Sequence, residues 1–300
     1  MTTWRSATIA GAAMMFIGLG VPAAQAAAID WASVPGKDVT LFYPGQTSWE
    51  SRINPAEHPG AAKFKAGKNC FGCHNGDEKN YGALLVSGKK DEPTPIAGKP
   101  GSIVANVKFA EDAQDLYVHL EFKEGAQPDA KMDPKFATKV TMMLIDSNVP
   151  EALRAGCWTS CHDEAASMQN AKGADRTLYL SGTRAPGADL AKLKASGYYM
   201  EYWQARLNPG QPAQAANGIV FDKRTETPTD VTATGQCAGG ACSVTLSRKL
   251  DAGKKLAAGK TYTVGFAVHA GHTAKRFHYV SYERTLALGQ GTADFVAVKK

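Results

Sequence analysis

Hydrophobic and polar residues alternate along two neighbouring stretches near the middle of the chain. In residues 103–109 every second position is apolar, and the same spacing returns in residues 116–122, after a turn at 111–113. A period of two places one set of side chains on one face of a strand. The pattern therefore predicts a β-hairpin with one buried face.

Other apolar runs predict further strands and a few helices. The strands are expected at residues 139–145, 218–222, 242–246, 261–269 and 277–283. The helices are expected at residues 149–155, 188–195 and 199–207. Many short strands separated by long loops are typical of a β-sandwich. We therefore expect a mainly β fold with helical insertions.

The first third of the chain has a different character. Residues 29–100 have few strand signals and many Gly, Pro, Lys and Asn residues, and Lys89–Pro95 has the composition of a connector. This change predicts a small loop- and helix-rich domain over residues 27–99. A β-sandwich domain is expected over residues 100–300.

The N-terminus has the pattern of a secretory signal peptide. Arg5 precedes an apolar run over residues 7–21, and Val21–Ala26 ends in an Ala-x-Ala pattern. We expect cleavage after Ala26 or one or two residues later, export to the periplasm, and no stable membrane anchor in the mature chain. The alternative is an uncleaved anchor, for which the apolar run is short.

The first of three cysteine pairs lies in Cys70-Phe71-Gly72-Cys73-His74, a Cys-x-x-Cys-His motif. This spacing is the attachment signature of c-type haem. Two thiols bond to the porphyrin edge, and the adjacent His74 can reach the iron as proximal ligand. A redox-active disulfide or half of a zinc site would use the same pair of cysteines. The first lacks its βαβ context and the second lacks a nearby second pair of ligands.

The sixth ligand of this haem has one histidine candidate in the same segment. No methionine occurs between Ala27 and Gly101, and His58 is the other histidine there. We expect His58 to ligate the iron. The alternatives for the sixth position are a ligand from the β domain, a lysine, or an open site.

A second pair lies in Cys157-Trp158-Thr159-Ser160-Cys161-His162, which has one residue more than the usual motif. The intact Cys-His dipeptide, the first haem motif in the same chain and an aromatic residue inside the loop favour a second haem. A Cys157–Cys161 disulfide followed by an incidental histidine would be the alternative.

Several blocks carry a resemblance to a known family. They are Val140–Leu144, Val149–Glu151, Ala155–Trp158, Cys161–Asp163, Tyr202–Ala205, Val264–Val268 and Arg276–Ser281. Through these blocks residues 100–298 resemble the haem-binding β-sandwich domain of the ethylbenzene dehydrogenase (DMSO reductase) type. That domain occurs in cytochrome subunits of periplasmic molybdoenzymes and in free multihaem c-type cytochromes.

The resemblance implies a ligand set for the second haem. Relatives with non-covalent haem use a methionine and a lysine, and the lysine position corresponds to His278. We therefore expect His162 as proximal and His278 as distal ligand. The alternatives left open for the distal position are His269, His272, Met142 and Met143.

The third pair, Cys237 and Cys242, has no following histidine and flanks a Gly-rich turn, which predicts a disulfide. The formal net charge is +6, with lysines scattered along the sequence and without an aromatic-interleaved basic stretch. Nucleic acid is therefore not an expected partner. A modest positive face could steer an acidic redox partner, although a plain solvated surface explains the charge as well.

Taken together, the motifs predict two covalently bound haems c and one-electron transfer in the periplasm. We expect an electron carrier rather than an enzyme, with a quinol-oxidising membrane cytochrome or a periplasmic oxidoreductase as redox partner. One alternative is a haem enzyme or sensor with an open iron site. The other is a single-haem, ligand-binding β-sandwich.

Overall fold

The strands and helices of the described residues all fall between Trp31 and Lys299. The computed structural model describes residues 1, 29–47, 49–156 and 180–300. The chain divides into two units, Met1–Asp30 and Trp31–Lys300, and all described elements belong to the second. Among the described residues no helix has the length and apolar character needed to cross a membrane.

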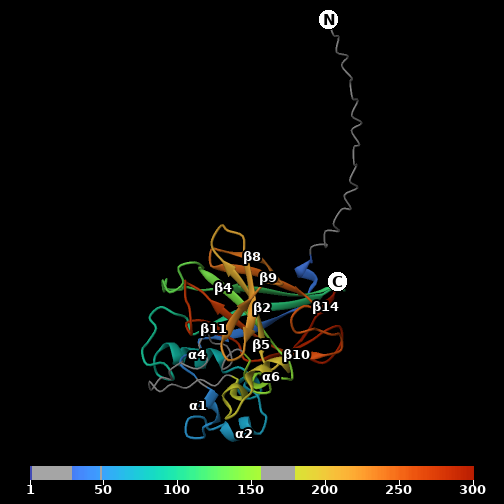
Figure 1. Cartoon of the computed structure of the whole chain (residues 1–300). Coiled ribbons are helices and arrows are strands. Elements are labelled where there is room, and N and C mark those ends of the chain that lie inside the picture. The colour runs from blue at the N-terminus through green and yellow to red at the C-terminus, as the bar shows by residue number, and fades with distance from the viewer. Residues whose placement is uncertain (2–28, 48, 157–179) are drawn as a thin grey trace. The chain divides into compact units, whose positions relative to one another are not determined.

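The fold is mainly β, as the sequence predicts (Figure 1). The strands are β1 (Gly36–Phe42), β2 (Ser102–Glu111), β3 (Asp115–Lys123), β4 (Thr138–Ile145), β5 (Met200–Leu207), β6 (Gln214–Val220), β7 (Arg224–Thr227), β8 (Val231–Ala238), β9 (Ala241–Lys249), β10 (Thr261–His269), β11 (Tyr279–Val280), β12 (Arg284–Ala287), β13 (Phe295–Val296) and β14 (Val298–Lys299). The helices are η1 (Trp31–Ser33), α1 (Trp49–Ile53), α2 (Ala61–Lys65), α3 (Cys70–His74), α4 (Glu78–Val86), α5 (Ala152–Ala155), η2 (Ser181–Arg184) and α6 (Leu190–Ala195).

The strands form one continuous sheet that folds back on itself. Along the sheet the order is β7-β6-β5-β4-β10-β11-β1-β2-β3-β9-β8. Although β5 and β6 are far from β8 in this order, they pack against it, and β5 also contacts β9. The two halves of the sheet therefore face each other as the layers of a sandwich, with the core between them.

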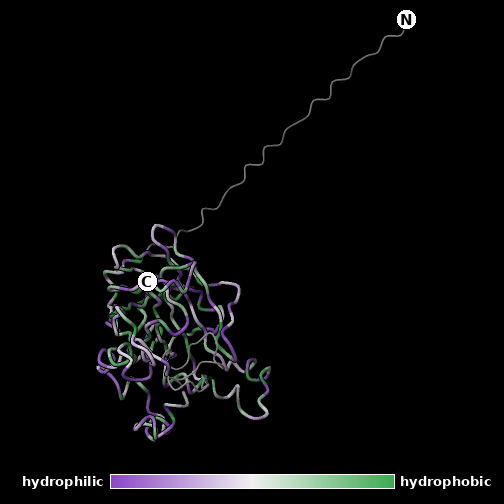
Figure 2. The backbone as a smooth tube through the Cα atoms, turned by 90° about the vertical axis from the view of Figure 1, so that its left-hand side faces the viewer, coloured by the Kyte–Doolittle hydropathy of each residue, from purple (hydrophilic) through white to green (hydrophobic). Residues whose placement is uncertain are grey.

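The predicted hairpin is present as β2 and β3. The strands pair antiparallel with Phe109 opposite Val118, and both side chains are buried. Strand β10 has the bounds expected from its apolar pattern. In Figure 2 hydrophobic and hydrophilic residues alternate over short distances along much of the chain, as strands with one buried face require.

One helix prediction is wrong. Residues 199–207, expected to be helical, form strand β5 between β4 and β6. Nearly every residue of β5 is buried, including Tyr202 and Trp203. A strand that is covered on both faces has no hydrophobic pattern with a period of two. The spacing of the aromatic residues in β5 therefore resembled that of a helix.

The N-terminal part of the chain also contributes a strand that the sequence pattern did not predict. Strand β1 pairs with β2 on one side and β11 on the other. Helices α1 to α4 lie in the excursion between β1 and β2. The amide of Tyr43 donates a hydrogen bond of 2.9 Å to the carbonyl of Gly101, which joins the two ends of the excursion. The division into domains at residue 100 stays a prediction.

The predicted disulfide is present between Cys237 and Cys242. These residues are directly opposite each other at the end of the β8–β9 hairpin. Gly239 and Gly240 both have positive φ in the turn between them. Glycine adopts that conformation without steric cost, so the turn closes tightly enough for the two cysteines to meet.

Candidate functional site

The first Cys-x-x-Cys-His motif forms the short helix α3. Asn69 caps this helix by accepting a hydrogen bond of 3.0 Å from the amide of Gly72. A Cβ at position 72 would lie 2.3 Å from the Asn69 oxygen, so the cap needs glycine at that position of the motif. Residues at i, i+3 and i+4 share one face of a helix, which places both cysteines and His74 together.

The two cysteines of this motif are free thiols with different exposure. Cys70 is buried and Cys73 is exposed. Burial raises the pKa of the Cys70 thiol well above its usual value, and the nearby Glu283 carboxyl raises it further. Both sulfurs are therefore available for bonding, and Cys73 marks the edge of the site that faces solvent.

His58 and His74, the two histidines predicted to ligate the first iron, lie close to each other. Their ring centroids are 6.1 Å apart, with an angle of 34° between the ring planes. Two imidazoles that bind one metal ion from opposite sides, each through a bond of about 2 Å, place their ring centres roughly 6 Å apart. The measured separation thus fits a single ion held between the two rings.

Each of the two rings has its Nδ1 occupied by a protein oxygen. His58 Nδ1 lies 2.8 Å from the carbonyl oxygen of Arg52, and His74 Nδ1 lies 3.3 Å from Asp77 Oδ2. An Nδ1–H bonded to an oxygen fixes the tautomer in which Nε2 carries the lone pair. Burial lowers the pKa of His58, which favours the neutral form that binds a metal.

A cavity of about 280 Å³ opens between these histidines. Its other lining residues are Arg52, Asp77, Asn80, Tyr81, Leu84, Lys90 and Tyr282. Two thiols and an adjacent imidazole form the donor set that a covalently attached haem requires, and the second imidazole offers a sixth ligand beside a partly apolar cavity. The residues present therefore fit a haem c.

Two residues of the C-terminal part complete this site, and the sequence analysis did not identify either. The Tyr282 ring stacks on His74 with centroids 6.0 Å apart, and it is 1% exposed. Glu283 Oε1 accepts a hydrogen bond of 2.9 Å from the amide of Phe71, inside α3. Both lie at the end of the predicted strand 277–283, but nothing in their own sequence context links them to a motif 212 residues away.

Glu283 is an unusual carboxyl because it is buried beside the attachment helix. Its Oε2 is buried and has no hydrogen-bond partner among the described residues. Burial raises the pKa of Glu283 to about 8, while the hydrogen bond from the Phe71 amide acts in the opposite direction. A Cβ added to Gly156 would lie 2.7 Å from the Glu283 amide nitrogen. Glu283 therefore also touches the residue that precedes the second cysteine motif.

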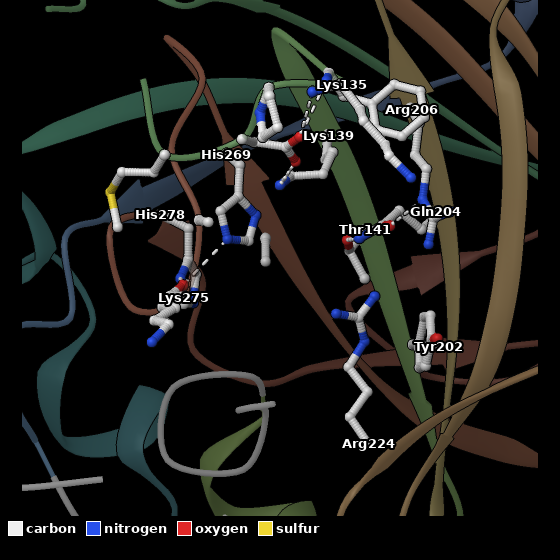
Figure 3. A pocket seen from close by; sticks show the side chains of 16 residues that line it. Lys135, Lys139, Thr141, Tyr202, Gln204, Arg206, Arg224, His269, Lys275 and His278 are labelled. Atoms are coloured by element: carbon white, nitrogen blue, oxygen red, sulfur yellow. Dashed lines mark hydrogen bonds and ion pairs between the residues drawn. The ribbon is translucent and has the colours of Figure 1, made fainter. Parts of the chain in front are cut away.

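The second motif itself, Cys157, Cys161 and His162, lies outside the described residues. Its expected distal ligand, His278, is 3% exposed. His278 and His269 line a second cavity of about 340 Å³ between β4, β5 and β10 (Figure 3). The cationic side chains of this cavity come from Lys135, Lys139, Arg206, Arg224 and Lys275.

The two histidines of the second cavity share one acceptor. His278 Nδ1 lies 2.6 Å and His269 Nε2 lies 3.1 Å from the carbonyl oxygen of Lys275. Their ring centroids are 4.7 Å apart. Burial lowers the pKa of His269 well below its usual value, and the neighbouring His278 lowers it further. Nδ1 of His269 is buried and has no partner within the described part of the chain.

The remaining alternatives for the distal position are less well placed. His272 Nδ1 lies 2.8 Å from the carbonyl oxygen of Asp133. His272 is not among the described residues that line the second cavity. Met142 and Met143 are fully buried in β4. Thr141 of the same strand lines the cavity, so Met142 points to the opposite face, whereas Met143 shares the face of Thr141 but is not among the described residues that line the cavity.

Two free thiols and a histidine in a Cys-x-x-Cys-His helix beside a cavity are the mark of c-type haem proteins. Two curated proteins are similar to this chain over most of its length. Cytochrome c-552 of Stutzerimonas stutzeri is 35% identical, covering 97% of this chain and 98% of that protein. Cytochrome c-551 of Rhodocyclus tenuis is 30% identical, covering 90% and 99%. The chain belongs to this family of c-type cytochromes and is an electron-transfer haem protein.

Two solved structures share a low level of structural similarity with the chain. A family 9 carbohydrate-binding module of Caldicellulosiruptor kristjanssonii in complex with glucose is 16% identical, with a TM-score of 0.30 over 60% of this chain and 66% of that chain. A putative carbohydrate-binding protein of Bacteroides uniformis is 13% identical, with a TM-score of 0.32 over 73% and 87%. Neither bears on the function. No protein-family model matches the chain.

Proposed function

We propose that the protein is a periplasmic dihaem cytochrome that passes single electrons between redox proteins. The observation that carries this proposal is the 6.1 Å separation of His58 and His74 beside the two free thiols of α3. An iron with two histidine ligands has no position left for a substrate, and such a centre suits electron transfer.

In the first site Cys70 and Cys73 would bond to the porphyrin, and His74 and His58 would bind the iron. Bound there, the haem supplies the one-electron redox couple. The protein's own contribution is orientation: Arg52 and Asp77 fix the two imidazoles through Nδ1, and Tyr282 supports the His74 ring. Two imidazole ligands favour a lower potential than a histidine–methionine pair.

The second haem is proposed at Cys157 and Cys161, with His162 and His278 as ligands. What supports His278 is its burial in a cavity whose rim carries positive charge, because haem propionates are anions. His269 is the second candidate for the distal position, since its buried Nδ1 has no partner in the described residues.

The proposed role also includes localisation and partners. The N-terminal residues have the pattern of a cleaved export signal, and haem attachment to Cys-x-x-Cys-His takes place outside the cytoplasm. We propose a quinol-oxidising cytochrome of the membrane or a periplasmic oxidoreductase as the redox partner. Held by Cys70, Cys73, His74 and His58, a haem would supply the one-electron couple for exchange with such a partner.

The haem count tests this proposal directly. Protein matured in a host that makes c-type cytochromes is assayed by pyridine haemochrome, with mass spectrometry of the same sample. We expect two haems per chain and low-spin ferric signals in electron paramagnetic resonance. A ratio of one would remove the second site, and rapid carbon monoxide binding to the reduced protein would indicate an open iron instead of a carrier.

A further inference from the structure

The segment that carries the first haem-attachment motif is rich in lysine. Residues 60–90 contain six lysines but two acidic residues, Asp77 and Glu78, so a tenth of the chain carries four of its six net positive charges. Helices α2, α3 and α4 all lie in this segment, at the end of the unit where Figure 1 shows α1, α2 and α4 together.

All six lysine side chains in this segment are exposed. They are Lys63, Lys65, Lys68, Lys79, Lys89 and Lys90. Of the two acids, Glu78 is buried and approaches Arg284, which leaves Asp77 as the exposed acid of the segment. Asp77 in turn lies beside His74. Within residues 60–90 the exposed charged side chains are therefore six lysines and one acid, which gives this segment a positive surface charge.

Three of the six lysines lie at the site or next in sequence to one of its residues. Lys90 lines the histidine cavity itself, and Lys79 is adjacent in sequence to Asn80, another lining residue. Lys68 directly precedes the capped helix α3, on which Cys73 is exposed. Leu84, a cavity-lining leucine of α4, is 43% exposed. An apolar centre with a charged rim is the anatomy of a transient protein interface.

We propose that this surface, formed by the six lysines and Leu84, docks the acidic face of a redox partner protein and exchanges electrons with it through the Cys73 edge of the first haem. The proposal rests on the proposed function, because it assumes a haem at Cys70 and Cys73. Opposite charge on a partner would raise the association rate at low salt, and screening by salt would remove the advantage.

The experiment compares two triple variants with the same net charge. K65E/K68E/K89E reverses charge at the proposed surface, and K123E/K255E/K260E does so at exposed lysines on β3 and in the β9–β10 loop. The probe is a flavodoxin, a small acidic one-electron donor. Its hydroquinone is oxidised to the semiquinone while one ferric haem is reduced, which stopped-flow absorbance follows.

We expect K65E/K68E/K89E to lower the second-order rate constant about tenfold or more at low ionic strength. The control triple should lower it much less, and the difference should vanish at high salt. A cationic oxidant, tris(phenanthroline)cobalt(III), should oxidise the reduced surface variant faster than the reduced wild type. Equal losses in both triples would overturn the proposal.

The haem content of each variant separates this proposal from the proposed function. If both triples carry the wild-type number of low-spin haems, a failure of the rate prediction concerns the docking surface alone. If the wild-type protein itself lacks a haem at Cys70 and Cys73, the proposed function has failed before docking is tested.

Discussion

The carboxyl of Glu283 accepts a hydrogen bond from the amide of Phe71, and this contact joins the C-terminal part of the sheet to the middle of the first haem motif. The bond spans 212 positions of sequence. It fixes α3 against the sandwich from one side, while Tyr282 supports the His74 ring from the same segment. The position of the attachment helix therefore depends on residues at the far end of the chain.

The titration of Glu283 predicts a pH-dependent stability. Its pKa is raised from 4.5 to about 8 by burial, so between these values the folded state retains a proton that the unfolded state releases. The free energy of unfolding should therefore decrease as pH rises from 4.5 to 8. Since one pKa unit is about 1.4 kcal/mol, the decrease should amount to a few kcal/mol.

The variant E283Q should lose this dependence, because glutamine does not titrate. Denaturant unfolding at pH 5 and pH 8.5 measures the effect on the haem-loaded protein. We expect E283Q to be more stable than the wild type at pH 8.5 and close to it at pH 5. Identical pH profiles for the two proteins would show that the carboxyl is charged in the folded state.

Replacing His58 should change the first haem without removing it. In H58A the thioether bonds and His74 remain, so the haem content should stay at the wild-type value while one iron becomes five-coordinate and binds carbon monoxide. H58M should raise the potential of that haem, because a thioether ligand favours the reduced state. Spectroelectrochemical titration measures the haem potentials of both variants.

The control for His58 is H119Q. His119 is buried in β3 and stacks on Trp31, with ring centroids 4.6 Å apart, far from the attachment helix in sequence. The H119Q protein should retain the same low-spin haems as the wild type. An H58A protein with unchanged spectra and no carbon monoxide binding would assign the sixth ligand to another residue.

A substitution at Gly60 offers a second test of His58 as the sixth ligand of the first haem. A Cβ at this position would lie 3.1 Å from Nε2 and Cε1 of His58, which is closer than most Cβ contacts. G60A should therefore weaken the iron bond of His58 and increase the fraction of high-spin iron, measured by electron paramagnetic resonance. In an H58A background the same substitution should add nothing, because the ring that it crowds is absent.

The distal ligand of the proposed second haem can be assigned by comparing two variants. H278A should convert the second haem to a high-spin form and leave the first unchanged. H269A should preserve the low-spin state but shift the spectrum slightly, because the two rings are 4.7 Å apart and share the Lys275 carbonyl. The opposite pattern, with low-spin iron lost in H269A, would make His269 the ligand.

Local patterns in the sequence predicted those parts of the fold that depend on local chemistry. The β2–β3 hairpin and β10 followed from alternation with one buried face. The Cys-x-x-Cys-His motif predicted that Cys70, Cys73 and His74 act together, and the structure places all three in the short helix α3. The disulfide followed from two cysteines around a glycine turn.

The parts that were missed depend on contacts between distant segments. Strand β5 is buried on both faces, so its pattern had no strand period. The role of Tyr282 exists because β11 pairs with β1 and brings the chain past α3. Pairing between strands that are remote in sequence determines both the burial of β5 and the position of Tyr282. A short stretch of sequence does not indicate which remote strand it will pair with.

The hydrogen bond between Tyr43 and Gly101 closes the excursion that contains α1 to α4. The chain leaves the sheet after β1 and returns to it in the adjacent strand, with Phe42 directly opposite Ser102. Insertions or deletions within the excursion would thus leave the strand register intact. The sequence and length of this excursion can therefore vary in evolution, or be exchanged by grafting, without a change in the β-sandwich that carries it.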